Sequence, residues 1–553
     1  MAPKILAETA MGRYVRAIRA SPRALIANPR LLTTAALYAM TGIPLCWDQG
    51  SSATIPSLPG FQRDFGFSSA TNAQQVSNFV SIVYIGCGVG SILSFFINDR
   101  VGRLWSMRLY SFVWIIGQLI ATGSSGHLGA LYASRIIAGL GIGGCCVTGP
   151  VSLVEIAPTE IRGLIAAWFT VTLLLSLFVA TFCTYGVFLH IPTGSLQYQV
   201  VFFGPCIFMA LVILVSFFCY ESPRWLFLVG RNADAERTLV ALRGLGSDHP
   251  RVASELEAIR TEIANEQEHF GKGVKTYSWT GLKAVCKETF LVKKNLRRAQ
   301  QAMICYALAQ LSGANSVTTY FVPILKIIGA AGNSKTESLF LAGMYSFAKF
   351  CFTIMASFFF IDALGRRKSL FIGITIQMIS DIYLGVFIKY RQLGDVSHSA
   401  SQAAIAMIFF HGFGYAIGLL VLPYVFGAEV WPNQIRSFGS ALCNAWHWFF
   451  FFGVNKGVPS LLARTNNWGA FLFFAGWCFI AWVYVYLTVP ELAGENLEDF
   501  DALYEGPWYT AFRRSTKSMP VSAENVIEGQ PVRKEHSDIA MDTKTAQSTA
   551  VSL

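Results

Sequence analysis

Charged residues are scarce in this chain of 553 residues, because Asp, Glu, Lys and Arg make up only 14%, against about a quarter in soluble globular proteins. This deficit excludes an ordinary soluble domain and a disordered chain. Strands with the period-two alternation of a transmembrane barrel are also missing. Instead, 53% of the residues are apolar, and they form runs of about twenty, enough to cross a hydrocarbon layer of roughly 30 Å. We therefore expect an integral membrane protein.

The sequence lacks the motifs of common enzymes. It has no H-E-x-x-H, no paired C-x-x-C, no nucleophile elbow and no phosphate-binding G-x-x-x-x-G-K-[ST]. We expect no enzymatic activity, no cofactor, no metal site and no ATP-driven pump within this chain. Gly139, Gly141 and Gly144 match G-x-G-x-x-G, but they lie in an apolar run, where glycines permit close helix packing. Most of the 12 cysteines also lie in apolar runs and are predicted to be core residues.

The apolar runs predict an all-α membrane protein with twelve transmembrane helices in two six-helix bundles, joined by a cytosolic helical linker. The predicted spans are 31–55, 76–97, 107–124, 128–154, 164–189, 200–219, 299–328, 338–361, 369–388, 403–428, 439–462 and 468–488. The expected parts are a cytosolic arm (1–30), the first bundle (31–219), the linker (220–298), the second bundle (299–488) and a cytosolic tail (489–553), disordered beyond about 515.

The charge distribution predicts the orientation. The 220–298 stretch carries fourteen Lys and Arg residues, whereas 56–75 carries one and 190–199 carries none. By the positive-inside rule, both termini should be cytoplasmic. The net charge of +11 follows the same rule, because its basic residues bracket apolar spans, so we expect no nucleic-acid partner.

Three motifs occur twice. Asp99-Arg-Val-Gly-Arg103 recurs after 263 residues, Glu155 to Arg162 after 274, and Glu221-Ser-Pro-Arg224 is echoed by Pro490-Glu491 after 270. Near-constant spacing indicates duplication, and parallel repeats are typical of transporters in which two bundles rock about a central site. We expect a cytoplasmic latch made of Asp99, Arg103, Glu155, Arg162, Glu221, Arg224, Asp362, Arg366, Glu429, Arg436 and Glu491. The alternative is simple anchoring of helix ends.

These motifs resemble those of sugar porters of the major facilitator superfamily, and within that group the fungal quinate-permease-like branch. The similarity covers roughly residues 35–505. Besides the repeats, it rests on Trp47-Asp-Gln-Gly50, Arg135-Ile-Ile-Ala-Gly-Leu-Gly, Glu221-Ser-Pro-Arg-Trp-Leu226 and Gln310-Leu-Ser-Gly-Ala-Asn315.

Among the ionisable residues inside predicted spans, four stand out, because a charge at that depth costs about 2.5 kcal/mol or more. Asp48 and Arg135 are candidates for proton coupling, since a carboxylate that alternates between protonated and Arg-paired states can carry a proton; a fixed ion pair is the alternative. The resemblance supports coupling, because proton-coupled sugar porters carry both residues. Lys349 either pairs with an acid or binds an anionic substrate group, and quinate-permease-like relatives are similar in having a lysine there. Asp381 is expected to serve packing or pairing.

A polyhydroxy solute needs hydrogen-bonding and aromatic partners. The resemblance implies that such contacts come from Thr170, Gln310, Asn315, Lys349, Tyr424, His447 and Trp448. The chain departs from the family pattern at Ala309, Thr170, Leu177, Tyr424 and His447, which favours a substrate other than glucose. His447 could equally be a structural residue.

We therefore expect a transporter that imports a monosaccharide, quinate or a uronate by proton symport with alternating access. The alternatives are a facilitative or efflux carrier of the same fold and a nutrient-sensing receptor. The expected partners are a small polar solute, protons and the lipid bilayer, and the expected working form is a monomer in the plasma membrane.

Overall fold

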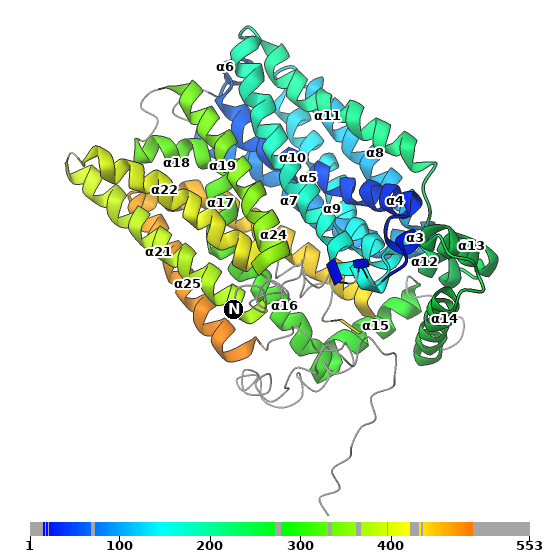
Figure 1. Ribbon diagram of the computed structural model, residues 1–553. Coiled ribbons are helices and arrows are strands. Elements are labelled where there is room, and N and C mark those ends of the chain that lie inside the picture. Colours follow the sequence, from blue (N-terminus) through cyan, green and yellow to red (C-terminus); the bar gives the residue numbers. More distant parts are fainter. Residues whose placement is uncertain are drawn as a thin grey trace, which may run out of the picture.

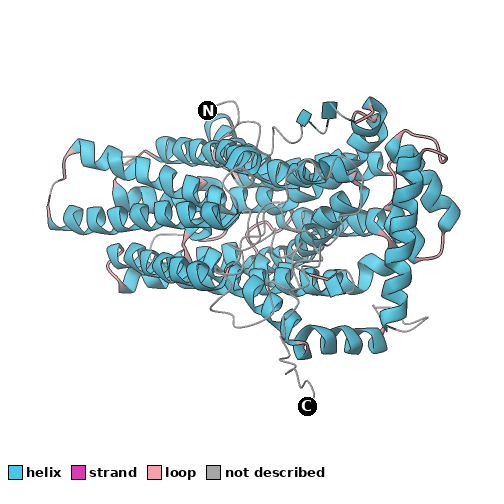
Figure 2. Cartoon of the chain, turned by 60° about the horizontal axis from the view of Figure 1, so that its bottom comes forward, coloured by secondary structure: helices cyan, strands magenta, loops and turns pink. Residues whose placement is uncertain are grey.

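The computed structural model describes residues 15–16, 18–19, 21–67, 72–270, 278–329, 334–360, 366–394, 396–420, 431–432 and 435–489. Within these ranges the chain forms helices joined by loops, and no strand is drawn (Figures 1 and 2). The predicted C-terminal tail beyond 489 lies outside the described residues.

The first bundle contains the first six predicted spans. Span one is divided into α4 (Pro29–Ala39), the turn η1 (Met40–Gly42) and α5 (Ile43–Thr54), and η2 (Ile55–Ser57) and α6 (Pro59–Asp64) follow it. Spans two to six are α7 (Asn72–Val101), α8 (Arg103–Thr122), α9 (Leu128–Ile156), α10 (Arg162–His190), which follows the turn η3 (Thr159–Ile161), and α11 (Ser195–Ser216).

The second bundle repeats this order. Span seven is divided into α16 (Lys293–Leu311), α17 (Ala314–Thr319) and α18 (Phe321–Ile328). Spans eight to twelve are α19 (Lys335–Met355) with the π-helical turn η4 (Ala356–Phe360), α21 (Arg366–Leu393), α22 (His398–Tyr415) with the π-helical turn η5 (Ala416–Leu420), α24 (Arg436–Arg464) and α25 (Trp468–Thr488).

All twelve predicted spans coincide with helices, which bears out the predicted all-α architecture. Within the described ranges, nine helices are long and apolar enough to cross a membrane. Spans one and seven are not among them because they are broken into shorter helices. Span eleven, α24, is continuous but carries Asn444, His447, Asn455 and Lys456, which lower its hydropathy. Polar residues and helix breaks inside a membrane mark surfaces that face a cavity or another helix rather than lipid.

Four helices follow the first bundle as a linker: α12 (Pro223–Leu228), α13 (Asn232–Arg243), α14 (Pro250–Phe270) and α15 (Trp279–Leu291). Helices α13 and α14 cover the two stretches in which amphipathic periodicity predicts helices. Figure 1 shows α12, α13 and α14 gathered at one end of the first bundle, next to α3 (Arg23–Ile26). We call this end of both bundles the linker end.

Glycines let α9 pack closely against its neighbours. A Cβ atom on Gly139 would lie 2.9 Å from the Cα of Gly86 on α7, and one on Gly141 would lie 2.7 Å from the Trp114 nitrogen on α8. A Cβ atom on Gly144 would run into the Tyr110 ring. The prediction that these glycines serve helix packing is therefore confirmed.

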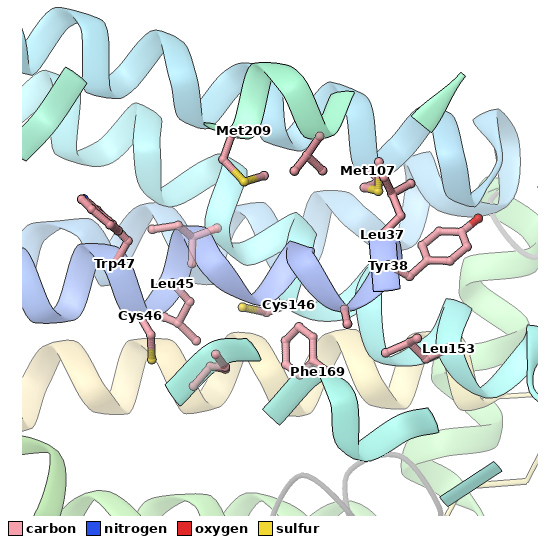
Figure 3. Close-up of a cluster of buried hydrophobic side chains, with 14 of the residues drawn as sticks. Leu37, Tyr38, Leu45, Cys46, Trp47, Met107, Cys146, Leu153, Phe169 and Met209 are labelled. Carbon is pink, nitrogen blue, oxygen red and sulfur yellow. The ribbon is translucent and has the colours of Figure 1, made fainter. Parts of the chain in front are cut away.

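The core next to the site is formed by α5, α9, α10 and α11. Leu45, Cys146, Phe169 and Met209 are buried together in one apolar cluster (Figure 3). Trp47 and Cys46 leave α5 in different directions (Figure 3), and the Trp47 indole donates to the Val201 carbonyl of α11 at 3.1 Å. This anchors one face of α5 inside the first bundle and leaves the Cys46 face for the second bundle.

Candidate transport site

Asp48 of α5 and Arg135 of α9 form a buried ion pair. Their side chains contact each other through both carboxylate oxygens, with Arg135 Nη2 donating to Asp48 Oδ2 at 2.8 Å. Asp48 is 2% exposed and Arg135 is 1% exposed. A bidentate pair of this kind restores part of the large free-energy cost of burying two charges.

The remaining donors of Arg135 are also satisfied. Its Nη2 donates to Ser52 Oγ at 2.6 Å, its Nε donates to the Phe79 carbonyl at 3.1 Å, and its guanidinium lies 4.7 Å from the centroid of the Phe79 ring. The guanidinium is therefore held by α7 as well as α5, and it would keep its position if Asp48 became neutral. Sequence analysis singled out Asp48 and Arg135, but not Ser52 or Phe79.

A cavity lies between the two bundles. Its lining comes from α5, α10, α17, α22, η5 and α24, and comprises Leu45, Cys46, Gln49, Phe169, Thr170, Leu173, Asn315, Tyr415, Leu420, His447, Trp448 and Phe451. Four of the predicted substrate contacts, Thr170, Asn315, His447 and Trp448, meet here. A mostly apolar cavity with a few polar groups is typical of small-molecule sites.

The polar groups of the second bundle form a directional chain along this cavity. Asn315 Nδ2 donates to Gln310 Oε1 at 3.0 Å, so the Gln310 amide nitrogen faces His447 Nδ1 at 3.2 Å and donates to it. Asn315 Nδ2 also lies 3.1 Å from the Tyr415 hydroxyl oxygen. This arrangement assigns the ring proton of a neutral His447 to Nε2. The break in span seven, where Gly313 has φ of 80°, brings Gln310 and Asn315 together.

Two buried donors at this cavity lack a partner within the described part of the chain. They are Gln49 Nε2 and Trp448 Nε1, and both residues line the cavity. A buried N–H without a partner costs free energy. A solute that offers hydroxyl or carboxylate oxygens at these positions would recover that cost.

Lys349 of α19 lies between this cavity and a smaller one. Its Nζ donates to Thr318 Oγ1 at 2.9 Å and lies 5.5 Å from the centroid of the Tyr415 ring. Thr318 lines the second cavity, and Tyr415 lines the first. Lys349 is 3% exposed, and within the described ranges no carboxylate forms an ion pair with it. Pairing with an acid and binding an anionic group of a substrate both stay predictions for Lys349.

Arg103 organises the predicted latch at the linker end. It is the first residue of α8 and binds two acids, with Nη1 2.7 Å from Asp99 Oδ1 and Nη2 2.8 Å from Glu155 Oε1. Its Nε donates to the other oxygen of Glu155 at 3.0 Å. The ends of α7, α8 and α9 are thereby joined through one guanidinium.

Backbone amides hold Glu221, another member of the predicted latch. Its carboxylate accepts hydrogen bonds from the backbone amides of Arg103, Leu104 and Ser222 at 2.9 to 3.1 Å. It thus caps the N-terminus of α8, where the helix dipole favours an anion. Burial raises the pKa of the Glu221 carboxyl above its ordinary value, although the amides favour the charged form.

Three other predicted latch arginines, Arg162, Arg224 and Arg436, lie near one acid of the linker. Arg162 and Arg436 are the first residues of α10 and α24, and Arg366 is the first residue of α21. Arg224 Nη1 forms an ion pair with Glu262 of α14 at 3.0 Å, and Arg162 and Arg436 lie within electrostatic range of the same glutamate. Four predicted residues, Tyr424, Asp362, Glu429 and Glu491, lie outside the described residues.

Sequence analysis did not identify the contacts that attach the linker to the first bundle. Arg243 of α13 is fully buried, donates to the Ile156 carbonyl at 2.7 Å and pairs with Glu255 at 2.6 Å. Arg251 of α14 pairs with Glu160 at 2.9 Å, and this hydrogen-bonded contact raises the pKa of Arg251. These residues lie in a charged stretch of ordinary composition, so no local signal separates them from surface residues.

Two six-helix bundles around a central, mostly apolar cavity with a few polar groups define a membrane transporter of the major facilitator fold, rather than an enzyme. Residues 34–504 match the sequence model of the family described as "Sugar (and other) transporter", and the chain belongs to that family. The resemblance inferred from the motifs is thereby confirmed.

Curated relatives and solved structures agree with this assignment. The chain is 29% identical over 490 residues to a "Probable quinate permease" of Aspergillus niger, covering 86% of this chain and 88% of the relative. It is 28% identical over 551 residues to the "Quinate permease" of Neurospora terricola, covering 96% of this chain and 98% of that relative. The proton:xylose symporter XylE, solved with bound 6-bromo-6-deoxy-D-glucose, matches with a TM-score of 0.70 at 20% identity, covering 86% of this chain and all of XylE. That structural likeness supports the fold alone.

Proposed function

We propose that this protein imports a carboxylated polyhydroxy solute, of the class of quinate and uronates, together with protons by alternating access. The observation that carries the proposal is the buried Lys349 ammonium beside the central cavity, which has a hydroxyl partner in Thr318 and no ion-paired carboxylate within the described ranges. Neutral monosaccharides are the second substrate class, because the same cavity offers amide, indole and imidazole groups.

A carboxylate on the solute would supply what Lys349 lacks. A buried ammonium is stabilised when it is paired, and a hydrogen bond between charged groups contributes about 1.5–3 kcal/mol. The unpartnered Gln49 and Trp448 donors would bind hydroxyl oxygens, and the rings of Phe169 and Trp448 would cover the apolar face of the solute. The names of the curated relatives also support this substrate class.

Proton coupling is proposed for the Asp48 and Arg135 pair. Protonation of Asp48 would release its ion pair, while Arg135 would stay bound to Ser52 and the Phe79 carbonyl. Asp48 is on α5, next to Gln49 and two residues from Cys46, and both of these residues line the cavity. A change in the ion pair would therefore reach the solute site through a single helix.

The remaining features of the proposal concern the cycle and the membrane. The latch around Arg103 and Glu262 would hold the linker ends of the bundles in one access state and open in the other. By the positive-inside rule, the basic linker supports a cytoplasmic location for that end and for both termini. A monomer in the plasma membrane is the proposed working form.

Uptake into proteoliposomes tests the proposal. The probes are quinate, galacturonate, xylose, glucose and a polyol, each supplied with an inward proton gradient and with the gradient collapsed. We expect accumulation of quinate or galacturonate that requires the gradient. Equilibration of a neutral sugar regardless of the gradient would instead identify a facilitator, and outward accumulation would identify an efflux carrier.

A further inference from the structure

A second pair of titratable side chains is buried in the second bundle, apart from the residues that line the central cavity. Asp381 of α21 and His411 of α22 are both 0% exposed, and His411 Nε2 lies 3.5 Å from Asp381 Oδ2. Within the described part of the chain, both Asp381 oxygens and His411 Nδ1 lack a hydrogen bond. We do not expect this pair to stabilise the fold, because apolar residues of similar volume at the two positions would avoid the free-energy cost of removing polar groups from water.

The imidazole also contacts the break in span seven. His411 Nε2 lies 3.3 Å from the Ser312 carbonyl oxygen, which can only accept, so Nε2 carries a proton when this bond is made. Gln377, one turn before Asp381 on α21, donates to Ser312 Oγ at 3.2 Å. Ser312 therefore depends on α21 and α22 for its position, and Asn315 of the central cavity follows it by three residues.

Few other ionisable groups face the pair. Tyr345 of α19 and Cys478 of α25 lie within electrostatic range of Asp381, and a Cβ atom on Gly412, beside His411, would lie 3.2 Å from the Tyr345 hydroxyl. Lys349 is one turn further along α19, with its Nζ 5.8 Å from the centroid of the Tyr345 ring. His411 is thus the only partner in ion-pair distance of Asp381 among the described residues.

The internal repeat relates this position to the first bundle. Arg103 and Arg366 are equivalent residues that begin α8 and α21, and the same interval separates Gln118 from Asp381. Gln118 is buried and hydrogen-bonds the Asp48 carboxylate. Asp381 therefore occupies the place that, in the first bundle, adjoins the proposed proton-coupling pair.

We propose that Asp381 and His411 form a second proton-binding site, whose occupancy controls the hydrogen bonding of the break in span seven. Without the proton, His411 donates its Nε2–H to the Ser312 carbonyl. A proton added to the imidazole draws Nε2–H toward the Asp381 carboxylate; a proton added to the carboxyl makes Asp381 the donor to Nε2 and moves the ring proton to Nδ1. In both cases the Ser312 carbonyl loses its donor, and the segment that carries Asn315 is loosened.

Infrared titration of the purified full-length chain tests proton binding without any solute. The parent is Asp48→Asn, which removes the carboxylate of the proposed proton-coupling pair. As the pH is lowered from about 8 to about 5, the range of imidazole titration, we expect a protonated-carboxyl or imidazolium signal to grow. Adding Asp381→Asn should remove the protonated-carboxyl signal. Adding His411→Gln instead should shift the titration midpoint of that signal by a pH unit or more. Spectra that neither change alters would overturn the proposal.

Hydrogen exchange tests the link to span seven. His411→Gln keeps an N–H that can reach the Ser312 carbonyl but cannot titrate. At acidic pH, peptides covering residues 308–319 should exchange about fivefold faster in the unmodified protein than in His411→Gln, as expected when one hydrogen bond is released. At alkaline pH, these peptides should exchange at the same rate in the two proteins. A ratio that stays constant across the pH range would show that His411 is only structural. If His411→Gln does not fold, the same ratio is measured with Asp381→Asn.

Discussion

Replacing Asp48 with Asn should separate transport from proton coupling. The amide is nearly the same size and can still accept a hydrogen bond from Arg135, but it cannot bind and release a proton. One pH unit corresponds to 1.36 kcal/mol per proton, so one-to-one symport concentrates a solute about tenfold per unit. We expect this accumulation in the unmodified protein and a ratio of one in Asp48→Asn, while exchange of labelled for unlabelled solute continues.

The charge of the solute sharpens this prediction. A carboxylate anion carried with one proton moves no net charge, so its accumulation should respond to the pH gradient and ignore a membrane potential. A neutral sugar carried with one proton should also respond to voltage, by about 2.3 kcal/mol per 100 mV. Proteoliposomes with potassium and valinomycin vary the two forces separately.

Stability and controls complete the test. Asp48→Asn leaves the Arg135 charge buried without a full counter-charge, and breaking such pairs costs up to about 3–5 kcal/mol, so its thermal unfolding temperature should fall. Asp234→Asn removes an acid of the partly exposed pair with Arg231 and should change neither transport nor stability. Tenfold accumulation by Asp48→Asn would refute the coupling role of Asp48.

Three further predictions concern other parts of the molecule. Lys349→Ala should raise the KM for quinate or galacturonate by about 10- to 100-fold, the loss of one charge-assisted contact, with little change for neutral sugars; equal losses for both classes would indicate a structural lysine, and exposed Lys389→Ala is the control. Glu155→Arg should slow turnover and lower stability by about 3 kcal/mol or more, because it places a second cation against Arg103; full activity would contradict the latch. Gly139→Ala should lower stability by about 1–3 kcal/mol in thermal unfolding, whereas Gly129→Ala on the same helix, where the new Cβ meets nothing within 4 Å, should be neutral; equal effects would exclude close packing at Gly139.

Much of the fold could be predicted because its determinants are local. A span is recognised by the length of an apolar run, and all twelve runs coincide with helices. The repeated charged motifs mark breaks between spans, and in the structure their arginines are the first residues of α8, α10, α21 and α24. Asp48, Arg135 and Lys349 could be found individually, since a charge within an apolar run is visible in one dimension.

Partners could not be found in this way, because they depend on which helices pack together. Ser52 and Phe79, which hold Arg135 beside Asp48, were missed, and Glu221 binds the amides of Arg103 and Leu104 more than 100 residues earlier. Tyr415 was missed because a tyrosine in an apolar run has no distinguishing signal until Asn315 is placed beside it. Asp381 was noted without a role because its partner, His411, lies on the next span.

The sequence by itself determined that this is a duplicated twelve-span membrane protein with charged motifs at one end and a few ionisable residues within its spans. Only the tertiary structure decided how those residues are used. It held Arg135 on Ser52 and the Phe79 carbonyl, left Lys349 facing hydroxyl and aromatic groups, and set His411 between Asp381 and the Ser312 carbonyl. The physical reason is that the free-energy cost of burying a charge can be seen from the residue and the apolar run around it in the sequence. The ion pairs and hydrogen bonds that offset this cost come from atoms on other helices.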